Sequence, residues 1–217
     1  MSSDWALFLA DHGWLVRADH VEVGPVHGWC RGPVAGLPAF SALLARSRVT
    51  ELRVAGRPME LLAWDLPEGP RFTFGPAPWT TDRPRHPLLR SLAEAWGGSI
   101  YLSTPQQEQR TWWNPNLDQL LTPECLDHDI AGMLDAYAWI WTNEGLSLPI
   151  DVSEWDTVAV EANGNTTLAH HRTGQLLLFA PDTDDDGLTV LPGCPENSLY
   201  TIDDAPDLIS WIEGAAA

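Results

Sequence analysis

Residues 156–182 constrain the fold most, because they contain three apolar runs separated by two tight-turn signals. Residues 162–165 carry the Asn-Gly pair typical of a two-residue hairpin loop, and Gly174 stands where the second turn needs a positive φ. The third run, residues 175–180, is apolar on both alternating faces, which is typical of a central strand covered on each side. This part of the chain therefore predicts an antiparallel sheet.

Five segments have the periodicity or end signals of helices, and the clearest of them ends at Gly145. Two strands are expected to be joined at Ala55 and Gly56, and Pro206 is expected in the first turn of the last helix. Because helices and strands are segregated, the pattern predicts an α+β fold with a mainly antiparallel sheet partly wrapped by helices. The expected segments are helices at residues 2–13, 38–48, 86–98, 127–145 and 202–214, and strands at 15–23 and 49–65.

Six prolines fall within residues 67–87, and they predict either a long surface connection or a boundary between two units. The chain then divides into an N-terminal α/β-containing segment, residues 1–84, and an α+β domain, residues 85–217. The alternative is that the N-terminal segment is integral to the same domain.

The sequence predicts a cytoplasmic protein. It has no run of about 18 apolar residues that would span a membrane. Its first residues lack a basic region and are interrupted by Asp4 and Asp11, unlike a signal peptide. The three cysteines are odd in number and widely spaced, so neither a disulfide framework nor a zinc pair is expected.

Charge is distributed unevenly along the chain. All twelve basic residues are arginine, and this excludes lysine-dependent chemistry such as a Schiff base or a P-loop. Residues 1–110 are balanced, whereas residues 111–217 hold nineteen acids and a single arginine, Arg172. Such a half is expected to repel nucleic acid and anionic membranes and to attract basic partners.

The stretch Asp-Thr-Asp-Asp-Asp-Gly at residues 182–187 matches the first half of an EF-hand calcium loop. Position 12 of such a loop would fall on Gly193, which has no side chain to act as a ligand. We therefore expect a solvated acidic turn whose calcium affinity is no tighter than about millimolar. A calcium-dependent interaction module is the alternative.

No catalytic motif is present, and we predict no catalytic residue, no cofactor and no metal. His170 and His171 are adjacent in a predicted strand, so their rings should face opposite ways, one packed and one exposed. His27 and Cys30 lack a second ligand pair. The tryptophan-rich residues 112–116 could stack on a sugar but are more typical of a core or interface. The alternative function is a small enzyme or ligand binder that uses such His or Trp residues in a pocket between the two halves.

The order of elements in three segments resembles the SUKH superfamily, in an actinobacterial-type variant. These segments are the helix at residues 86–98, the strands within 148–182 and the closing segment 198–214. The resemblance implies an α+β fold with a sheet partly wrapped by helices. It also implies a binding role, because many members are immunity proteins that neutralise toxins, often nucleases, and others are regulators.

Charge and resemblance together favour a non-catalytic protein-binding module of immunity or regulatory type. Its partner is expected to be a basic protein, such as a toxin, rather than nucleic acid or membrane. The residues expected to contact that partner are Asp182, Asp184, Asp185, Asp186 and Glu196.

Overall fold

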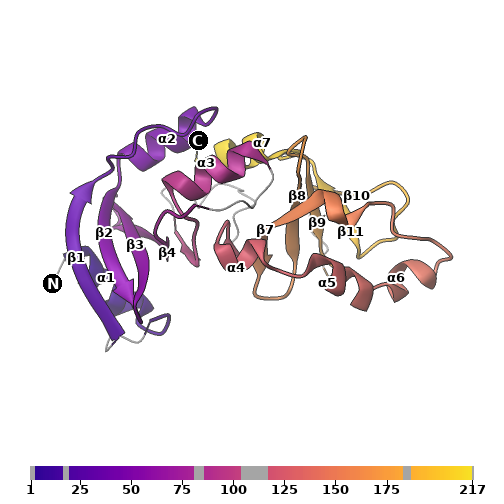
Figure 1. The fold of residues 1–217 in the computed structure, drawn as a ribbon, viewed down its shortest axis with the longest axis horizontal. Coiled ribbons are helices and arrows are strands. Elements are labelled where there is room, and N and C mark those ends of the chain that lie inside the picture. The colour runs from indigo at the N-terminus through magenta and orange to yellow at the C-terminus, as the bar shows by residue number, and fades with distance from the viewer. Residues whose placement is uncertain (1–2, 17–19, 81–85, 104–116, 183–186, 217) are drawn as a thin grey trace.

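The computed structural model describes residues 3–16, 20–80, 86–103, 117–182 and 187–216, and it confirms the α+β prediction. Two antiparallel sheets lie at opposite ends of an elongated molecule, with helices between and around them (Figure 1). The first sheet has five strands and the second has six.

The first sheet has the order β1-β2-β3-β4-β5, with every neighbouring pair antiparallel. The predicted hairpin between β2 and β3 is confirmed, because Ala55 and Gly56 both have positive φ, 48° and 82°. The strand expected from residue 15 begins only at Val21. The strands are β1 (Val21–Gly28), β2 (Arg48–Val54), β3 (Arg57–Trp64), β4 (Arg71–Pro76) and β5 (Tyr101–Leu102).

Helix α1 (Ser3–His12) covers one face of the first sheet. Trp5 and Phe8 are three residues apart, so they lie on one side of the helix, and both pack against Phe74 of β4. Asp4 is also buried, and its carboxylate accepts two hydrogen bonds of 2.9 Å from Arg48 of β2. The arginine therefore neutralises a charge that would otherwise be costly to bury.

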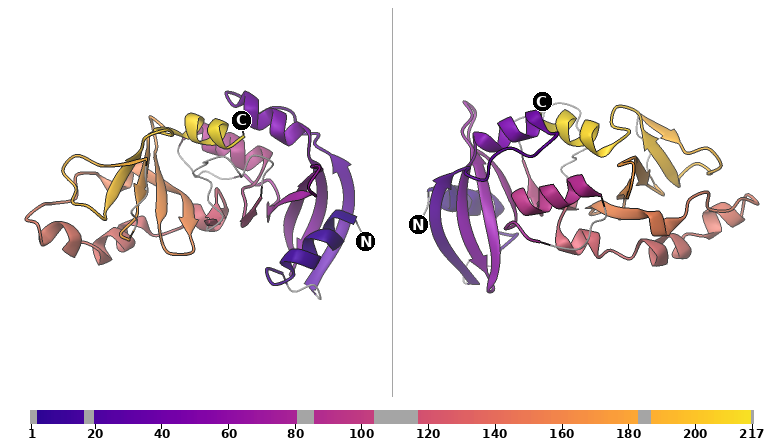
Figure 2. Two further views of the ribbon diagram at one scale, coloured as in Figure 1. Left: turned by 180° about the vertical axis from the view of Figure 1, so that it is seen from behind. Right: turned by 45° about the horizontal axis from the view of Figure 1, so that its top comes forward.

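The opposite face of the first sheet contributes to a larger core shared with α2 (Pro38–Ala45), α3 (Pro87–Ala95) and α7 (Leu208–Ala216). These three helices lie together between the sheets, and the C-terminus lies beside α2 (Figure 2). Glu213 of α7 accepts hydrogen bonds from the backbone N–H groups of Ala39 and Phe40, at 2.9 and 3.0 Å. Residues on both sides of position 84 thus share one core and one pair of packed helices.

Strand β4 lies inside the proline-rich segment, where we expected only a connection or a boundary. That expectation is wrong over residues 71–76, which form a strand between β3 and β5 with the side chains from Phe72 to Phe74 buried. Pro70 precedes the strand and Pro76 ends it. Because proline is tolerated at strand ends, the proline count concealed a short apolar strand between them.

The second sheet has the order β10-β11-β9-β8-β7-β6. It confirms the three strands and both turns predicted for residues 156–182, with positive φ at Gly164 and Gly174. Strand β9 lies between β8 and β11 and is buried throughout, as predicted for a central strand. The strands are β6 (Leu117–Leu120), β7 (Trp155–Glu161), β8 (Thr166–His170), β9 (Leu176–Phe179), β10 (Leu188–Val190) and β11 (Leu199–Ile202).

Short helices replace the single long helix expected at residues 127–145. The backbone leaves helical geometry at Tyr137, where ψ is 8° and the ring packs edge-on against Phe179 at 5.1 Å. This aromatic contact with β9 outweighs the local helix pattern. Asp127 and Asp129 were the two caps predicted for the long helix, and Asp129 caps the helix that begins at Ile130. The elements are α4 (Pro123–Leu126), α5 (Ile130–Ala136), α6 (Trp139–Thr142) and the 3₁₀ turn η2 (Val152–Glu154).

Helix α7 begins at Leu208, later than predicted, so Pro206 lies before its first turn. The carbonyl of Pro206 accepts a hydrogen bond of 2.9 Å from the N–H of Leu176 in β9. Because this contact holds residue 206 beside the sheet, the helix is capped one residue later, where Asp207 Oδ1 accepts from Ser210 N at 2.9 Å.

Candidate functional site

Exposed carboxylates occur in and between the short helices of the C-terminal half. Helices α4, α5 and α6 follow one another along one side of the second sheet (Figure 1). No arginine or lysine occurs between residues 111 and 171. The negative charge of this side is therefore not balanced by basic residues of its own segment. We call the acidic face the five exposed carboxylates Asp127, Asp129, Asp135, Glu144 and Asp151.

A groove runs between α5 and residues 146–157, and it has two adjoining halves. The first half has a volume of about 360 Å³ and is mainly apolar, with Leu134 and Trp141 in its wall. The second has a volume of about 400 Å³ and contains Asp127, Asp129 and Asp156. Ala131 and Val152 line both halves, so the two meet there. We call this feature the two-part groove, with its apolar half and its acidic half.

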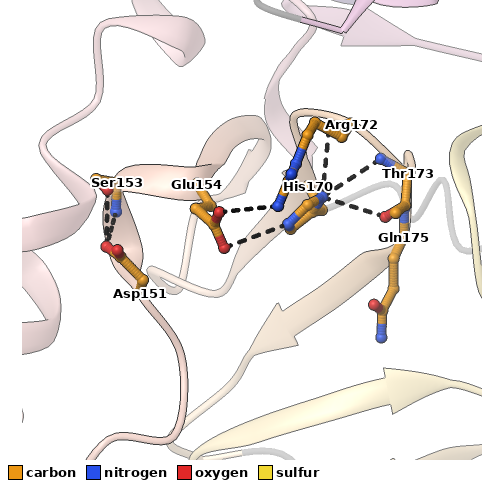
Figure 3. A network of polar contacts seen from close by, with 7 residues as sticks. All are labelled: Asp151, Ser153, Glu154, His170, Arg172, Thr173 and Gln175. Atoms are coloured by element: carbon orange, nitrogen blue, oxygen red, sulfur yellow. Dashed lines mark hydrogen bonds and ion pairs between the residues drawn. The ribbon is translucent and has the colours of Figure 1, made fainter.

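The wall of the two-part groove at residues 151–154 is held by its own hydrogen bonds. Asp151 Oδ1 accepts from the N–H of Ser153 at 3.0 Å and from its hydroxyl at 2.7 Å (Figure 3). This side chain therefore caps η2 and fixes the turn that carries Val152 into the groove.

Glu154, the last residue of η2, connects this segment to the β8–β9 turn. Its carboxylate lies 3.2 Å from Arg172 Nη2 and 3.6 Å from His170 Nε2 (Figure 3). His170 Nδ1 in turn accepts from the N–H groups of Arg172 and Thr173, each at 3.3 Å. The network thus gives Arg172, the single arginine of this half, a local role as the ion-pair partner of Glu154.

Both histidines are largely buried, whereas strand alternation predicts one packed and one exposed ring. The side chains of His170 and His171 are 13% and 10% exposed, so the expectation of one exposed ring is wrong. Strand β8 ends at His170, and the next residue already belongs to the turn. His171 Nε2 lies 3.1 Å from Asp156 Oδ1, whereas His170 faces Glu154. Within the described residues, no group of three or more His, Cys, Asp or Glu is placed to hold a metal ion.

The three cysteines differ in burial and in the groups that lie near them. Cys125 is buried, and burial raises the pKa of its thiol, so it stays protonated and is a poor nucleophile. Cys194 lies 3.5 Å from the indole nitrogen of Trp141. Cys30 is exposed, and the imidazole Nε2 of His27 lies 3.3 Å from the carboxylate of Glu51.

The structure brings two of the residues predicted to bind a partner to the same end of the second sheet. The N–H of Ala180 donates to the carbonyl of Ser198 at 2.9 Å and extends the β9–β11 pairing toward Asp182 and Glu196, which are both exposed. Residues 191–198 also contact α6 through Cys194 and Trp141. Glu196 therefore lies in a loop that packs on the helices of the acidic face.

Other predicted sites fall where the structure gives no description. Asp184, Asp185 and Asp186 lie outside the described residues, as do the tryptophan-rich residues 112–116. Gly193, at position 12 of the calcium motif, is exposed and has a φ of 88°.

The acidic face itself was not identified from the sequence. The signal that could have found it is the polar side of residues 127–145, where aspartates alternate with the apolar residues of the core.

Two further observations complete the description. No helix in the described ranges has both the length and the apolar character needed to cross a membrane. Comparisons of the chain with protein-family models, with curated proteins and with solved structures gave no match.

Proposed function

We propose that this chain is a non-catalytic binding module, of immunity or regulatory type, whose acidic face docks a basic protein such as a toxin. The observation that carries the proposal is the acidic face itself, five exposed carboxylates in a region of the chain without arginine or lysine. Asp129 and Asp151 cap α5 and η2, so folding accounts for these two, whereas repulsion among carboxylates so close along the chain costs stability. The order of elements that resembles the SUKH superfamily favours the same role, and we place the encounter in the cytoplasm.

Apolar surface near the acidic face supports a docking role. Trp139 of α6 is 57% exposed, and Leu146 in the following loop is 38% exposed. Exposed tryptophan beside charged residues is typical of protein interfaces, where aromatic anchors contribute much of the binding energy. Asp182 and Glu196 are included in the proposed surface as its extension at the end of the second sheet, and Asp184, Asp185 and Asp186 are included on the sequence prediction alone.

The proposal is tested by immobilising the protein and identifying by mass spectrometry the proteins that it captures from a lysate of its source cells. The purified product of the neighbouring gene is tested as a partner in the same way. We expect a captured protein with a basic surface, released when the salt concentration is raised, because exposed ion pairs are screened by salt. Capture of an acidic or neutral protein whose binding ignores salt would contradict the proposal. A bound metabolite retained after purification, or micromolar calcium binding, would favour the alternative functions instead.

A further inference from the structure

The two-part groove can recognise an apolar side chain of a partner as well as a positive charge. Its apolar half is walled by the side chains of Leu134, Trp141, Leu146 and Leu148. A volume of about 360 Å³ is at the small end for ligand pockets, so it suits one or two side chains better than a large ligand. Burying an apolar side chain of leucine size there would contribute about 1.5–3 kcal/mol before the costs of association.

The acidic half presents carboxylates at a fixed position beside this apolar wall. Asp129 is held at the start of α5 because its Oδ1 accepts from the N–H of Gly132 at 2.9 Å. Asp127 is exposed on the same side of the groove. A guanidinium or ammonium group in the acidic half would therefore meet one carboxylate, that of Asp129, whose position is set by its hydrogen bond to the helix.

The spacing of the two halves limits how a partner segment can fill both. Asp129, the cap of α5, and Leu134 are five residues apart, which at about 1.5 Å per residue is a rise of about 7.5 Å along the helix axis. An extended chain advances about 3.3 Å per residue, so this span matches two residues of an extended segment. An apolar side chain and a cationic one separated by a single residue would reach both halves together.

We propose that the two-part groove binds an extended segment of the partner in which an apolar residue and an arginine or lysine are separated by one residue. The apolar side chain enters the half lined by Leu134 and Trp141, and the cation pairs with Asp127 and Asp129. This inference rests on the proposed function and adds the partner's recognition sequence to it.

The test uses synthetic peptides and fluorescence polarisation on the full chain. The probe is labelled Gly-Arg-Ser-Leu-Ser-Arg-Gly, and the controls replace the leucine by serine or both arginines by glutamine. We expect binding by the probe that is at least about tenfold tighter than binding by either control, because each control loses one of the two contacts. Equal binding by the probe and either control would overturn the inference.

A matched pair of variants locates the binding. Ala131→Arg puts bulk and positive charge where the two halves meet, whereas Ala136→Arg makes the same change at an exposed position of α5 outside the groove. We expect Ala131→Arg to weaken probe binding by at least about tenfold and Ala136→Arg by less than about threefold. Circular dichroism checks that both variants fold. Equal affinities of the two variants for the probe would show that it binds outside the groove and would overturn the inference.

The same variants separate this inference from the proposed function. If the basic partner still binds in a salt-dependent manner but ignores Ala131→Arg, the groove inference fails and the proposed function stands. If neither the partner nor the probe responds to salt, both fail. Self-association that is lost in Ala131→Arg, measured by analytical ultracentrifugation, would show a second copy in the groove and would also overturn the inference.

Discussion

Replacing Gly98 by alanine is expected to lower the free energy of unfolding by about 3 kcal/mol or more. Gly98 has a φ of 95°, and a Cβ built on it would lie 2.5 Å from the carbonyl oxygens of both Leu120 and Leu121. These are backbone atoms and cannot rotate away. The next residue, Ser99, exchanges two hydrogen bonds of 2.8 Å with Leu120. The substitution would therefore push apart Ser99 and Leu120, whose bridge links the segment leading into β5 of the first sheet to β6 of the second.

Two other glycines are the controls for this prediction. Gly164 has a similar φ of 92°, but a Cβ built on it meets no atom within 4 Å, so Gly164→Ala should cost only about 1 kcal/mol of backbone strain. At Gly28 φ is not positive and a built Cβ also meets no atom within 4 Å, so Gly28→Ala should be close to neutral. Urea denaturation measures all three. If Gly98→Ala cost no more than Gly164→Ala, close backbone packing at Gly98 would not be important.

Replacing Glu213 by alanine is expected to cost about 2 kcal/mol, since hydrogen bonds to a charged group contribute more than neutral ones. The first residues of α2 have no side-chain cap from Leu37, and the carboxylate of Glu213 serves instead by accepting from Ala39 and Phe40. A negative charge at this helix end also interacts favourably with the helix dipole. Glu213→Gln keeps an acceptor oxygen without the charge and should lose about half as much.

Hydrogen exchange gives this prediction a local measurement. The amides of Ala39 and Phe40 should exchange faster in Glu213→Ala than in the native protein, because they lose their acceptor. Glu94→Ala, at an exposed position of α3, is the control and should leave both rates unchanged. Unchanged protection of the two amides in Glu213→Ala would mean that α7 does not cap α2.

The sequence predicted the parts of the fold that depend on neighbouring residues. The hairpins β2–β3 and β7–β8–β9 follow from alternation and turn residues within a few positions of one another. Strands such as β5 and β10 have two or three residues, too few for alternation to be detected. The contact between Glu213 and Ala39 joins residues 174 positions apart, and no local pattern predicts such a pairing.

From the sequence, the candidate site could be predicted only as an excess of negative charge in residues 111–217. Composition places nineteen acids in one half but does not show which of them cap a helix or pair with an arginine. Asp207 caps a helix, Glu213 caps another, and Glu124 pairs with Arg57 of the first sheet. The two-part groove depends on the break between α5 and α6, which the sequence pattern did not indicate.

The measurement that tests the docking proposal most directly is the association rate of the captured partner at about 10 and about 150 mM salt, over which the Debye length falls from about 30 to about 8 Å. Two fourfold variants carry the same net charge. One neutralises four members of the acidic face, and the other neutralises exposed acids of the N-terminal half. The first variant changes Asp127, Asp129, Asp135 and Glu144 to their amides, and the second changes Asp11, Glu22, Glu68 and Glu94.

We expect the native protein to associate at least about tenfold more slowly at the higher salt, because steering by charge is screened. At low salt the acidic-face variant should associate several-fold more slowly than the control variant, although their net charges are equal. Equal rates for the two variants, or a native rate that ignores salt, would contradict docking through the acidic face.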